Sequence, residues 1–199
     1  MLGTSVALMS IVDKDRQFFK SQIGLDQPLA QLRQTDLDHS FCQWVVAKSE
    51  ALLIEDSRTH ETLQYNKAVT ELGVIAYAGI PLIAQSGMAI GSFCALDSKP
   101  KSWNEEDVLT LEDLAKATES FITLRGALNP KPLKGTAGIA RNCANLHACG
   151  AAINALTSVL DRYRSRMPNV LGMELIGLVK QLTQQLIQFT EIHVTNVTR

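Results

Sequence analysis

The sequence predicts an α+β protein with a helical C-terminal extension, and two observations lead to this prediction. Short, β-rich apolar runs separated by turn residues fill the first half of the chain. After residue 104 the apolar residues recur at helical spacing instead. A chain of 199 residues can bury one core and still carry a smaller appendage.

The first elements are predicted to form a hairpin. The apolar run 5–12 ends at the turn residues 13–15, and the run 17–23 continues as its antiparallel partner. The stretch 24–39 that follows is polar and irregular. We therefore expect no regular element there.

A helix is predicted to begin at Ser40, because Gln43 three residues later completes a capping box. Phe41, Trp44 and Val45 would form its apolar side. The next run, 51–54, is short and continuously apolar. Such a run is typical of a strand buried on both faces.

The segment 57–72 is polar with few apolar anchors, which indicates a short helix or an ordered loop that covers part of the domain. Two strands follow at about 74–83 and 89–96, joined by a turn that contains glycine. Asn104 then caps a long helix, with Asp107 at the third helical position.

A boundary is predicted after residue 128, because the prolines in 129–132 interrupt the long helix. This gives a first domain over 1–128 and a helical extension over 129–199. Within the extension, 140–164 and 171–189 carry leucine-rich stripes at helical spacing. Two such helices form an αα-hairpin that needs a partner surface.

Charge and cysteine usage exclude several classes of protein. Residues 1–128 carry 11 Lys and Arg against 17 Asp and Glu, whereas residues 129–199 carry 8 against 3. The basic residues of the tail are scattered, which does not favour nucleic-acid binding. Four cysteines in 199 residues make no disulfide framework, and no apolar run is long enough to span a bilayer. We expect a cytoplasmic protein that binds no membrane.

An ordered series of motifs over about residues 5–127 resembles the GAF domain family of small-molecule sensors, which is common in bacteria. The series is Val6-Ala7-Leu8, Arg16-Gln17-Phe18-Phe19, Ser40-Phe41-Cys42, Leu52-Leu53-Ile54-Glu55-Asp56, Tyr77-Ala78-Gly79-Ile80-Pro81-Leu82, Gly91-Ser92-Phe93-Cys94-Ala95-Leu96-Asp97 and Trp103.

The resemblance implies a central antiparallel β-sheet flanked by helices. It also implies a ligand pocket between one sheet face and the segment 57–72. The family usually has a helix before its first strand, and here that N-terminal helix is missing or truncated. The function implied is a non-catalytic sensory or regulatory domain for signal transduction.

Departures from the family's known ligand motifs narrow the choice of ligand. Bilin-binding members carry a cysteine in the segment before the Tyr77 strand, and residues 57–76 contain none. The cyclic-nucleotide motif is matched only in part, by Asp97-Ser98 and by Trp103 with Asp107. We therefore expect an unidentified small-molecule ligand and no cofactor.

The candidate ligand-binding residues are aromatic or polar and lie at the ends or faces of predicted elements. Phe41, Tyr65 and Tyr77 would supply apolar walls and a hydroxyl group. Asp56, just past a strand end, would offer a carboxylate. Cys94, in the second strand of the pair, completes the set.

Two other functions remain open on the sequence. Cys42 and Cys94 could serve a thiol-dependent free methionine sulfoxide reductase, because a thiolate near a helix start is favoured. A GAF fold with an occluded pocket could act only as a dimerisation scaffold. A metal site at Cys143, His147 and Cys149 is not favoured, since Cys149 leaves the helix face that the other two share.

The helical extension 129–199 indicates the expected partners. Its two leucine-rich stripes predict a homodimer through the C-terminal helices. A sensory domain of this kind would also act on a downstream signalling protein.

Overall fold

The computed structural model describes residues 2–128, together with 150–151, 154, 157–159 and 161–162. The chain divides into two compact units, Met1–Ala115 and Lys116–Arg199. The described residues between 150 and 162 are helical. The break at 129–132 and most of the predicted hairpin, including all of 171–189, lie outside the described residues.

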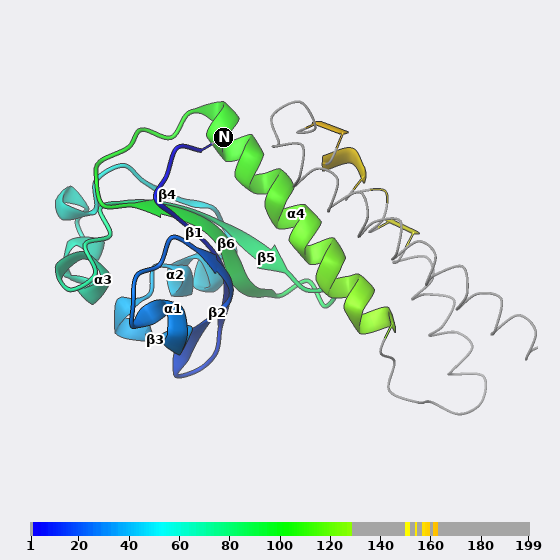
Figure 1. The fold of residues 1–199 in the computed structure, drawn as a ribbon, viewed down its shortest axis with the longest axis horizontal. Helices are drawn as coiled ribbons and strands as arrows, with labels where there is room; N and C mark the ends of the chain where they lie inside the picture. Colours follow the sequence, from blue (N-terminus) through cyan, green and yellow to red (C-terminus); the bar gives the residue numbers. More distant parts are fainter. Residues whose placement is uncertain (1, 129–149, 152–153, 155–156, 160, 163–199) are drawn as a thin grey trace, which may run out of the picture. The chain divides into compact units, whose positions relative to one another are not determined.

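A six-stranded, fully antiparallel sheet forms the centre of the first unit, as the sequence resemblance implied (Figure 1). Its strand order is β3-β2-β1-β6-β5-β4. The strands are β1 (Val6–Val12), β2 (Arg16–Ile23), β3 (Gln34–Asp36), β4 (Leu52–Ile54), β5 (Ala76–Ile83) and β6 (Ala89–Asp97).

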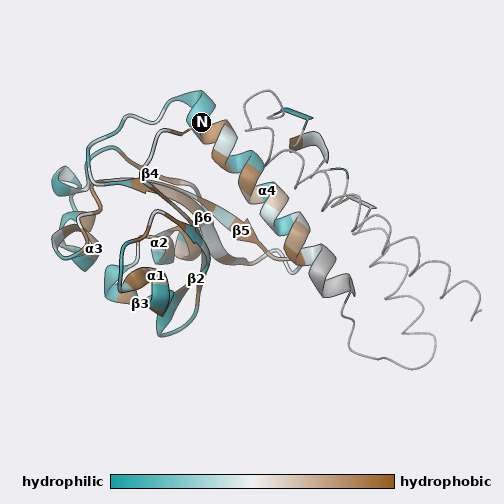
Figure 2. Ribbon diagram, viewed as in Figure 1, coloured by the Kyte–Doolittle hydropathy of each residue, from teal (hydrophilic) through white to brown (hydrophobic). Residues whose placement is uncertain are grey.

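The helices lie on the two faces of this sheet (Figure 1). One face carries α2 (Cys42–Lys48), with α1 (Leu29–Leu32) and α3 (Lys67–Thr70) beside it. The first turns of α4 (Glu105–Leu128) pack on the other face, where Leu111 and Ala115 are buried. Hydrophobic bands alternate with hydrophilic ones along α4 (Figure 2).

Two predicted helix starts are confirmed by hydrogen bonds. Ser40 Oγ accepts a bond from the Gln43 backbone N–H at 3.1 Å, although the Gln43 side chain donates to the Ser40 carbonyl rather than accepting from its N–H. At α4, Asn104 Oδ1 accepts from the Asp107 N–H at 2.9 Å, and Asp107 Oδ2 accepts from the Asn104 N–H at 3.4 Å. These bonds satisfy N–H groups that a helix cannot pair internally.

Two predictions for apolar residues are wrong. Leu53 was expected to be buried, but it is 43 % exposed because β4 is an edge strand and only its other face, with Ile54, contacts the core. Trp44 was placed on the apolar side of α2, yet it is 38 % exposed. Phe41 and Val45, four residues apart, make the buried side of that helix.

The polar stretch 24–39 is more regular than its sequence suggested. It contains α1, β3 and a short 3-10 helix, Leu37–His39. The strand β3 forms because it pairs with β2, with Thr35 opposite Gln17. The segment 57–72 forms two 3-10 turns, Ser57–Thr59 and Leu63–Tyr65, followed by α3. This agrees with the short helix or ordered loop that the sequence indicated.

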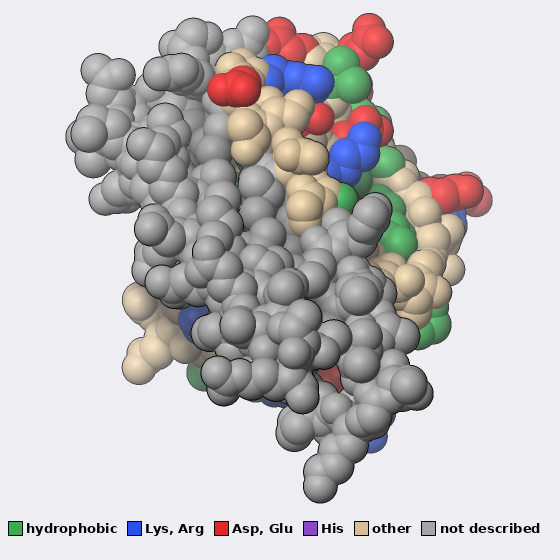
Figure 3. All heavy atoms as spheres, turned by 90° about the vertical axis from the view of Figure 1, so that its right-hand side faces the viewer, with side chains coloured by type: hydrophobic (Ala, Val, Ile, Leu, Met, Phe, Trp, Pro, Cys, Tyr) green, Lys and Arg blue, Asp and Glu red, His purple; other side chains and the backbone are tan. Residues whose placement is uncertain are grey.

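None of the helices in the described part of the chain is long and apolar enough to cross a bilayer. The described side chains on the face in Figure 3 include both acidic and basic groups close together.

Candidate functional site

A cavity of about 500 Å³ lies over the sheet face that also carries α2. Strands β1, β2, β5 and β6 supply one wall, with Leu8, Phe19, Tyr77 and Leu96. The opposite walls come from the segments 24–29 and 71–74, with Ala68 of α3. The lining is largely aliphatic and aromatic, which is typical of small-molecule sites.

A buried polar network fixes the start of α2 against the sheet. Ser40 Oγ donates to Gln17 Oε1 at 2.7 Å, and Gln17 Nε2 donates to Thr35 Oγ1 at 2.8 Å. Ser10 Oγ also donates to Gln17 Oε1, at 3.4 Å. Gln17 is only 5 % exposed but reaches the cavity, so it places an amide group among apolar walls.

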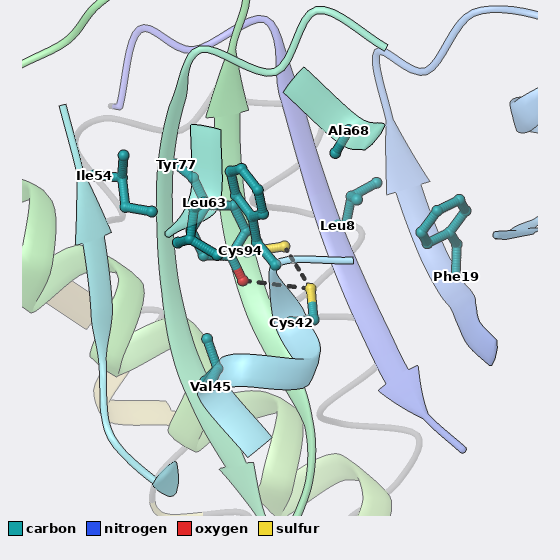
Figure 4. Packing of buried hydrophobic residues seen from close by; sticks show 10 residues of the cluster. Leu8, Phe19, Cys42, Val45, Ile54, Leu63, Ala68, Tyr77 and Cys94 are labelled. Atoms are coloured by element: carbon teal, nitrogen blue, oxygen red, sulfur yellow. Dashed lines mark hydrogen bonds between the residues drawn. The ribbon is translucent and has the colours of Figure 1, made fainter. Parts of the chain in front are cut away.

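A cluster of sulfur and hydroxyl groups lies beneath the cavity (Figure 4). The Sγ atoms of Cys42 and Cys94 are 3.7 Å apart. The Tyr77 hydroxyl donates to Cys42 Sγ at 3.3 Å and lies 3.3 Å from Ser92 Oγ. The Phe41 ring meets the Tyr77 ring edge to face, with 5.2 Å between their centroids.

The two thiols of this cluster differ in acidity. The hydrogen bond with Cys94, as the largest cause, and the bond from the Tyr77 hydroxyl together lower the pKa of Cys42 to about 7 against the opposing effect of burial. The bond to Cys42 and burial raise the pKa of Cys94. Burial raises the pKa of Tyr77, so its hydroxyl remains a donor. Cys42 is therefore the member of the pair that loses its proton first.

The charged groups around the cavity are mostly acidic. Asp26, Glu71 and Asp97 line it, and the described lining residues include neither Lys nor Arg. His39 is the one basic group among them, and its Nε2 lies 2.9 Å from Glu71 Oε2. Asp97 accepts backbone hydrogen bonds from Ser5 and Lys99, which hold its carboxylate at the rim.

The structure brings three of the five predicted ligand-binding residues together. Phe41 and Tyr77 line the cavity. Cys94 is fully buried and does not line it, but it contacts Cys42, which does.

The other two predicted residues do not line this cavity. Asp56 accepts hydrogen bonds from the backbone and side chain of Arg58, which caps the turn Ser57–Thr59 and lowers the pKa of the carboxyl. Tyr65 is 78 % exposed and lines a separate hollow of about 300 Å³ together with Trp44.

The cavity wall that sequence reasoning missed is the segment 24–29. Gly24 has a φ of +83°, and a Cβ there would lie 2.0 Å from the Ser5 carbonyl oxygen, so only glycine lets the chain turn here. That glycine, directly after a predicted strand, was the signal in the sequence for a turn at this point. The expected cover, 57–72, contributes Ala68, Glu71 and Leu72.

Within the described residues, no group of three or more His, Cys, Asp or Glu side chains could hold a metal ion. Cys143, His147 and Cys149 lie outside the described residues.

The antiparallel sheet with helices on both faces and the partly open cavity on one of them define an α+β domain with a small-molecule-sized site. The chain belongs to the GAF domain family, whose model matches residues 1–120. This match confirms the resemblance of the sequence motifs.

Among characterised proteins, the chain is similar to the cyclic di-GMP phosphodiesterase PA2567 of Pseudomonas aeruginosa. The two are 35 % identical over 125 residues. The match covers 61 % of this chain but 20 % of that protein, so the chain spans about one fifth of its length.

Solved structures with a similar fold include the GAF domain of the Acinetobacter phosphoenolpyruvate-protein phosphotransferase. It is 17 % identical, with a TM-score of 0.49, and the match covers 63 % of this chain and 74 % of that one. The free methionine-R-sulfoxide reductase of Neisseria meningitidis is 20 % identical, with a TM-score of 0.47 and coverage of 59 % and 66 %.

Proposed function

We propose that this chain is a non-catalytic sensory domain that binds a small organic molecule in the cavity between β1, β5 and the segment 24–29. The observation that carries the proposal is the cavity itself. Its volume of about 500 Å³ lies within the range of ordinary ligand sites, roughly 300–1,000 Å³. A scaffold with an occluded pocket would have no such space.

The charge of the lining favours a neutral or cationic ligand. A phosphate group would meet the carboxylates of Asp26, Glu71 and Asp97 without any Lys or Arg from the described lining to offset them. Like charges at close range oppose binding, and apolar walls weaken the screening between them. An aromatic or aliphatic molecule with an amine or amide group fits these walls better.

Signal transmission would follow from the walls that the ligand contacts. A ligand shifts a conformational equilibrium toward the state that it binds more tightly. Contacts with 24–29 and 71–74 would therefore favour one arrangement of these segments over others. We propose that the flanking helices and a homodimer formed through the C-terminal helices carry this shift to a downstream signalling protein.

The relation to a longer protein supports a regulatory role. The matched region is one fifth of a cyclic di-GMP phosphodiesterase. We propose that this chain regulates an activity that resides elsewhere, either in an attached region or in a partner protein.

A second candidate function is the thiol-dependent reduction of free methionine sulfoxide by Cys42 and Cys94. The observation that favours it is the 3.7 Å separation of the two sulfurs. Against it, Cys42 is only 2 % exposed and Cys94 is completely buried, so a substrate sulfoxide has little access to either sulfur. An assay of free methionine sulfoxide with a thiol reductant separates the two functions, and we expect no turnover.

Native mass spectrometry of protein purified without added ligand tests the sensory proposal. We expect a non-covalent adduct with the mass of a small organic molecule, which is lost under denaturing conditions. Protein that carries no adduct, from any of several expression media and from its own host, contradicts the proposal.

A further inference from the structure

We propose that Cys42 and Cys94 form a reversible disulfide when a hydroperoxide enters the cavity, so that this wall of the site also responds to oxidants. The proposal concerns the thiol pair and does not require the cavity to bind an organic ligand. Its failure would therefore leave the proposed sensory function untouched.

The geometry of the pair carries the proposal. Cys42 is the first residue of α2 and Cys94 lies within β6, so the bond would join two separate elements across the core. Their Sγ atoms are in direct contact at 3.7 Å (Figure 4). A disulfide needs an S–S distance of about 2.05 Å, so the sulfurs must approach by about 1.7 Å.

The position of each sulfur relative to the cavity orders the two steps. Cys42 lines the cavity, whereas Cys94 is fully buried behind it and does not. A small oxidant that enters the cavity therefore meets the Cys42 sulfur first. The hydrogen bonds from Cys94 and Tyr77 lower the pKa of Cys42, which favours the nucleophilic thiolate at this position.

The chemistry balances with one hydroperoxide molecule. The Cys42 thiolate attacks the terminal peroxide oxygen, the O–O bond breaks, and Cys42 becomes a sulfenic acid while the leaving oxygen takes up a proton as water or an alcohol. The Cys94 thiol then attacks the Cys42 sulfur, the S–O bond breaks, and the second oxygen leaves as water. Two thiols are oxidised by two electrons, and the peroxide is reduced by two.

The bond would change the cavity wall. Tyr77 now donates its hydroxyl to Cys42 Sγ, and both residues line the cavity. A disulfide sulfur is a weaker acceptor than a thiolate, so the Tyr77 hydroxyl would lose part of that interaction. The start of α2, which carries Phe41, would also be drawn toward β6.

Peptide mapping of the whole chain tests the proposal. The protein is reduced, freed of reductant, treated with hydrogen peroxide, unfolded with an alkylating reagent and digested with trypsin. Trypsin cleaves after Lys and Arg except before proline, so the Lys99-Pro100 bond stays intact. Cys42 then lies in peptide 34–48, Cys94 in 68–101, and both Cys143 and Cys149 in 142–162. We expect 34–48 joined to 68–101, with the loss of two hydrogen atoms, and release of both peptides by dithiothreitol.

Other outcomes of the mapping overturn the proposal. These are recovery of 34–48 and 68–101 as alkylated thiols, recovery of either as an irreversible sulfinic acid, or a link from either to 142–162. The Cys143→Ser, Cys149→Ser double variant is the matched control. It should give the same yield of the linked pair, and loss of the link in that control also contradicts a direct reaction between Cys42 and Cys94.

A second measurement tests the order of the steps. In the Cys94→Ser variant the sulfenic acid on Cys42 has lost the one other thiol of the described residues. Dimedone, which traps sulfenic acids, should therefore label Cys42 several-fold more in this variant than in the unsubstituted protein. Equal labelling of the two proteins, or preferential labelling of Cys94 in Cys42→Ser, contradicts the proposed order.

Discussion

Gly79 makes room for the hydroxyl group of Tyr77. The two residues are separated by one position on β5 and so face the same side of the sheet. A Cβ at Gly79 would lie 2.3 Å from Tyr77 Oη and 2.8 Å from Ser92 Oγ. The absence of a side chain at one position therefore lets an aromatic ring extend beneath the cavity and reach the two cysteines.

Substitution of Gly79 by alanine should therefore destabilise the first unit. We expect Gly79→Ala to lower the free energy of unfolding by about 1–3 kcal/mol, the usual cost of overpacking a core. The chain's two tryptophans, Trp44 and Trp103, both lie in this unit, so tryptophan fluorescence in urea follows its unfolding. Gly150→Ala, where a Cβ meets nothing within 4 Å, is the control and should leave this transition unchanged.

Loss of the Tyr77 hydroxyl should raise the pKa of Cys42. Its bond to Cys42 Sγ is one of the interactions that lower this pKa, and Tyr77→Phe removes it. The ultraviolet absorbance of the Cys42 thiolate is obtained by subtracting the spectrum of Cys42→Ser. It should titrate near pH 7 in the unsubstituted protein and at a higher pH in Tyr77→Phe. Tyr65→Phe, at an exposed tyrosine far from the thiols, should not move it.

The same shift has a consequence for stability. The pKa of Cys42 falls from 9.0 to about 7 on folding, so the unfolded chain holds more protons between these values. The contribution of Cys42 to stability is therefore present above pH 9 and lost as pH falls through 7. Urea unfolding at pH 7 and pH 9 should show less gain with pH in Tyr77→Phe than in the unsubstituted protein, and an equal gain would contradict the assignment.

The capping box of α4 should contribute measurably to stability. Asn104→Ala removes the acceptor of the Asp107 N–H bond, and the loss of such a cap costs about 1 kcal/mol. Glu105→Ala, at the adjacent residue outside the two capping bonds, is the matched control. A urea midpoint for Asn104→Ala equal to that of the control would show that the cap adds nothing.

The strands and helix starts were predictable because their signals are local. The apolar runs 74–83 and 89–96 with the turn between them, the Ser40–Gln43 pair and the Asn104–Asp107 pair each lie within one turn or one hairpin. The elements that were missed depend on distant partners. The strand β3 exists only through its pairing with β2, which no pattern within 24–39 reveals.

The candidate site was predictable in its core and not at its rim. Phe41, Tyr77 and Cys94 were found because each lies on the buried face of a predicted helix or strand. The Asp56 carboxylate accepts a hydrogen bond from the Arg58 side chain. In the turn Leu63–Tyr65, Leu63 is the buried residue and Tyr65 is exposed. The orientations of such loop side chains depend on local hydrogen bonds and on contact with solvent. Hydrophobic periodicity carries no information about either.

Assembly through the C-terminal helices remains a prediction from the sequence. The stripe in 171–189 includes Leu178 and Leu182, and an aspartate at both positions would bury charge in any seam that they form. Analytical ultracentrifugation should show a dimer for the unsubstituted chain and a monomer for the double variant. A wild-type monomer, or a dimer that survives both substitutions, contradicts this prediction.

Cavity occupancy in two matched tryptophan variants tests the central claim most directly. Leu29 and Leu32 share α1, but Leu29 lines the cavity whereas Leu32 does not and is 58 % exposed. Native mass spectrometry should show that Leu29→Trp, which puts a bulkier side chain into the cavity lining, carries less of the bound molecule, while Leu32→Trp retains it at the level of the unsubstituted protein. Full occupancy in Leu29→Trp, or equal loss in both variants, would show that the molecule does not bind in this cavity.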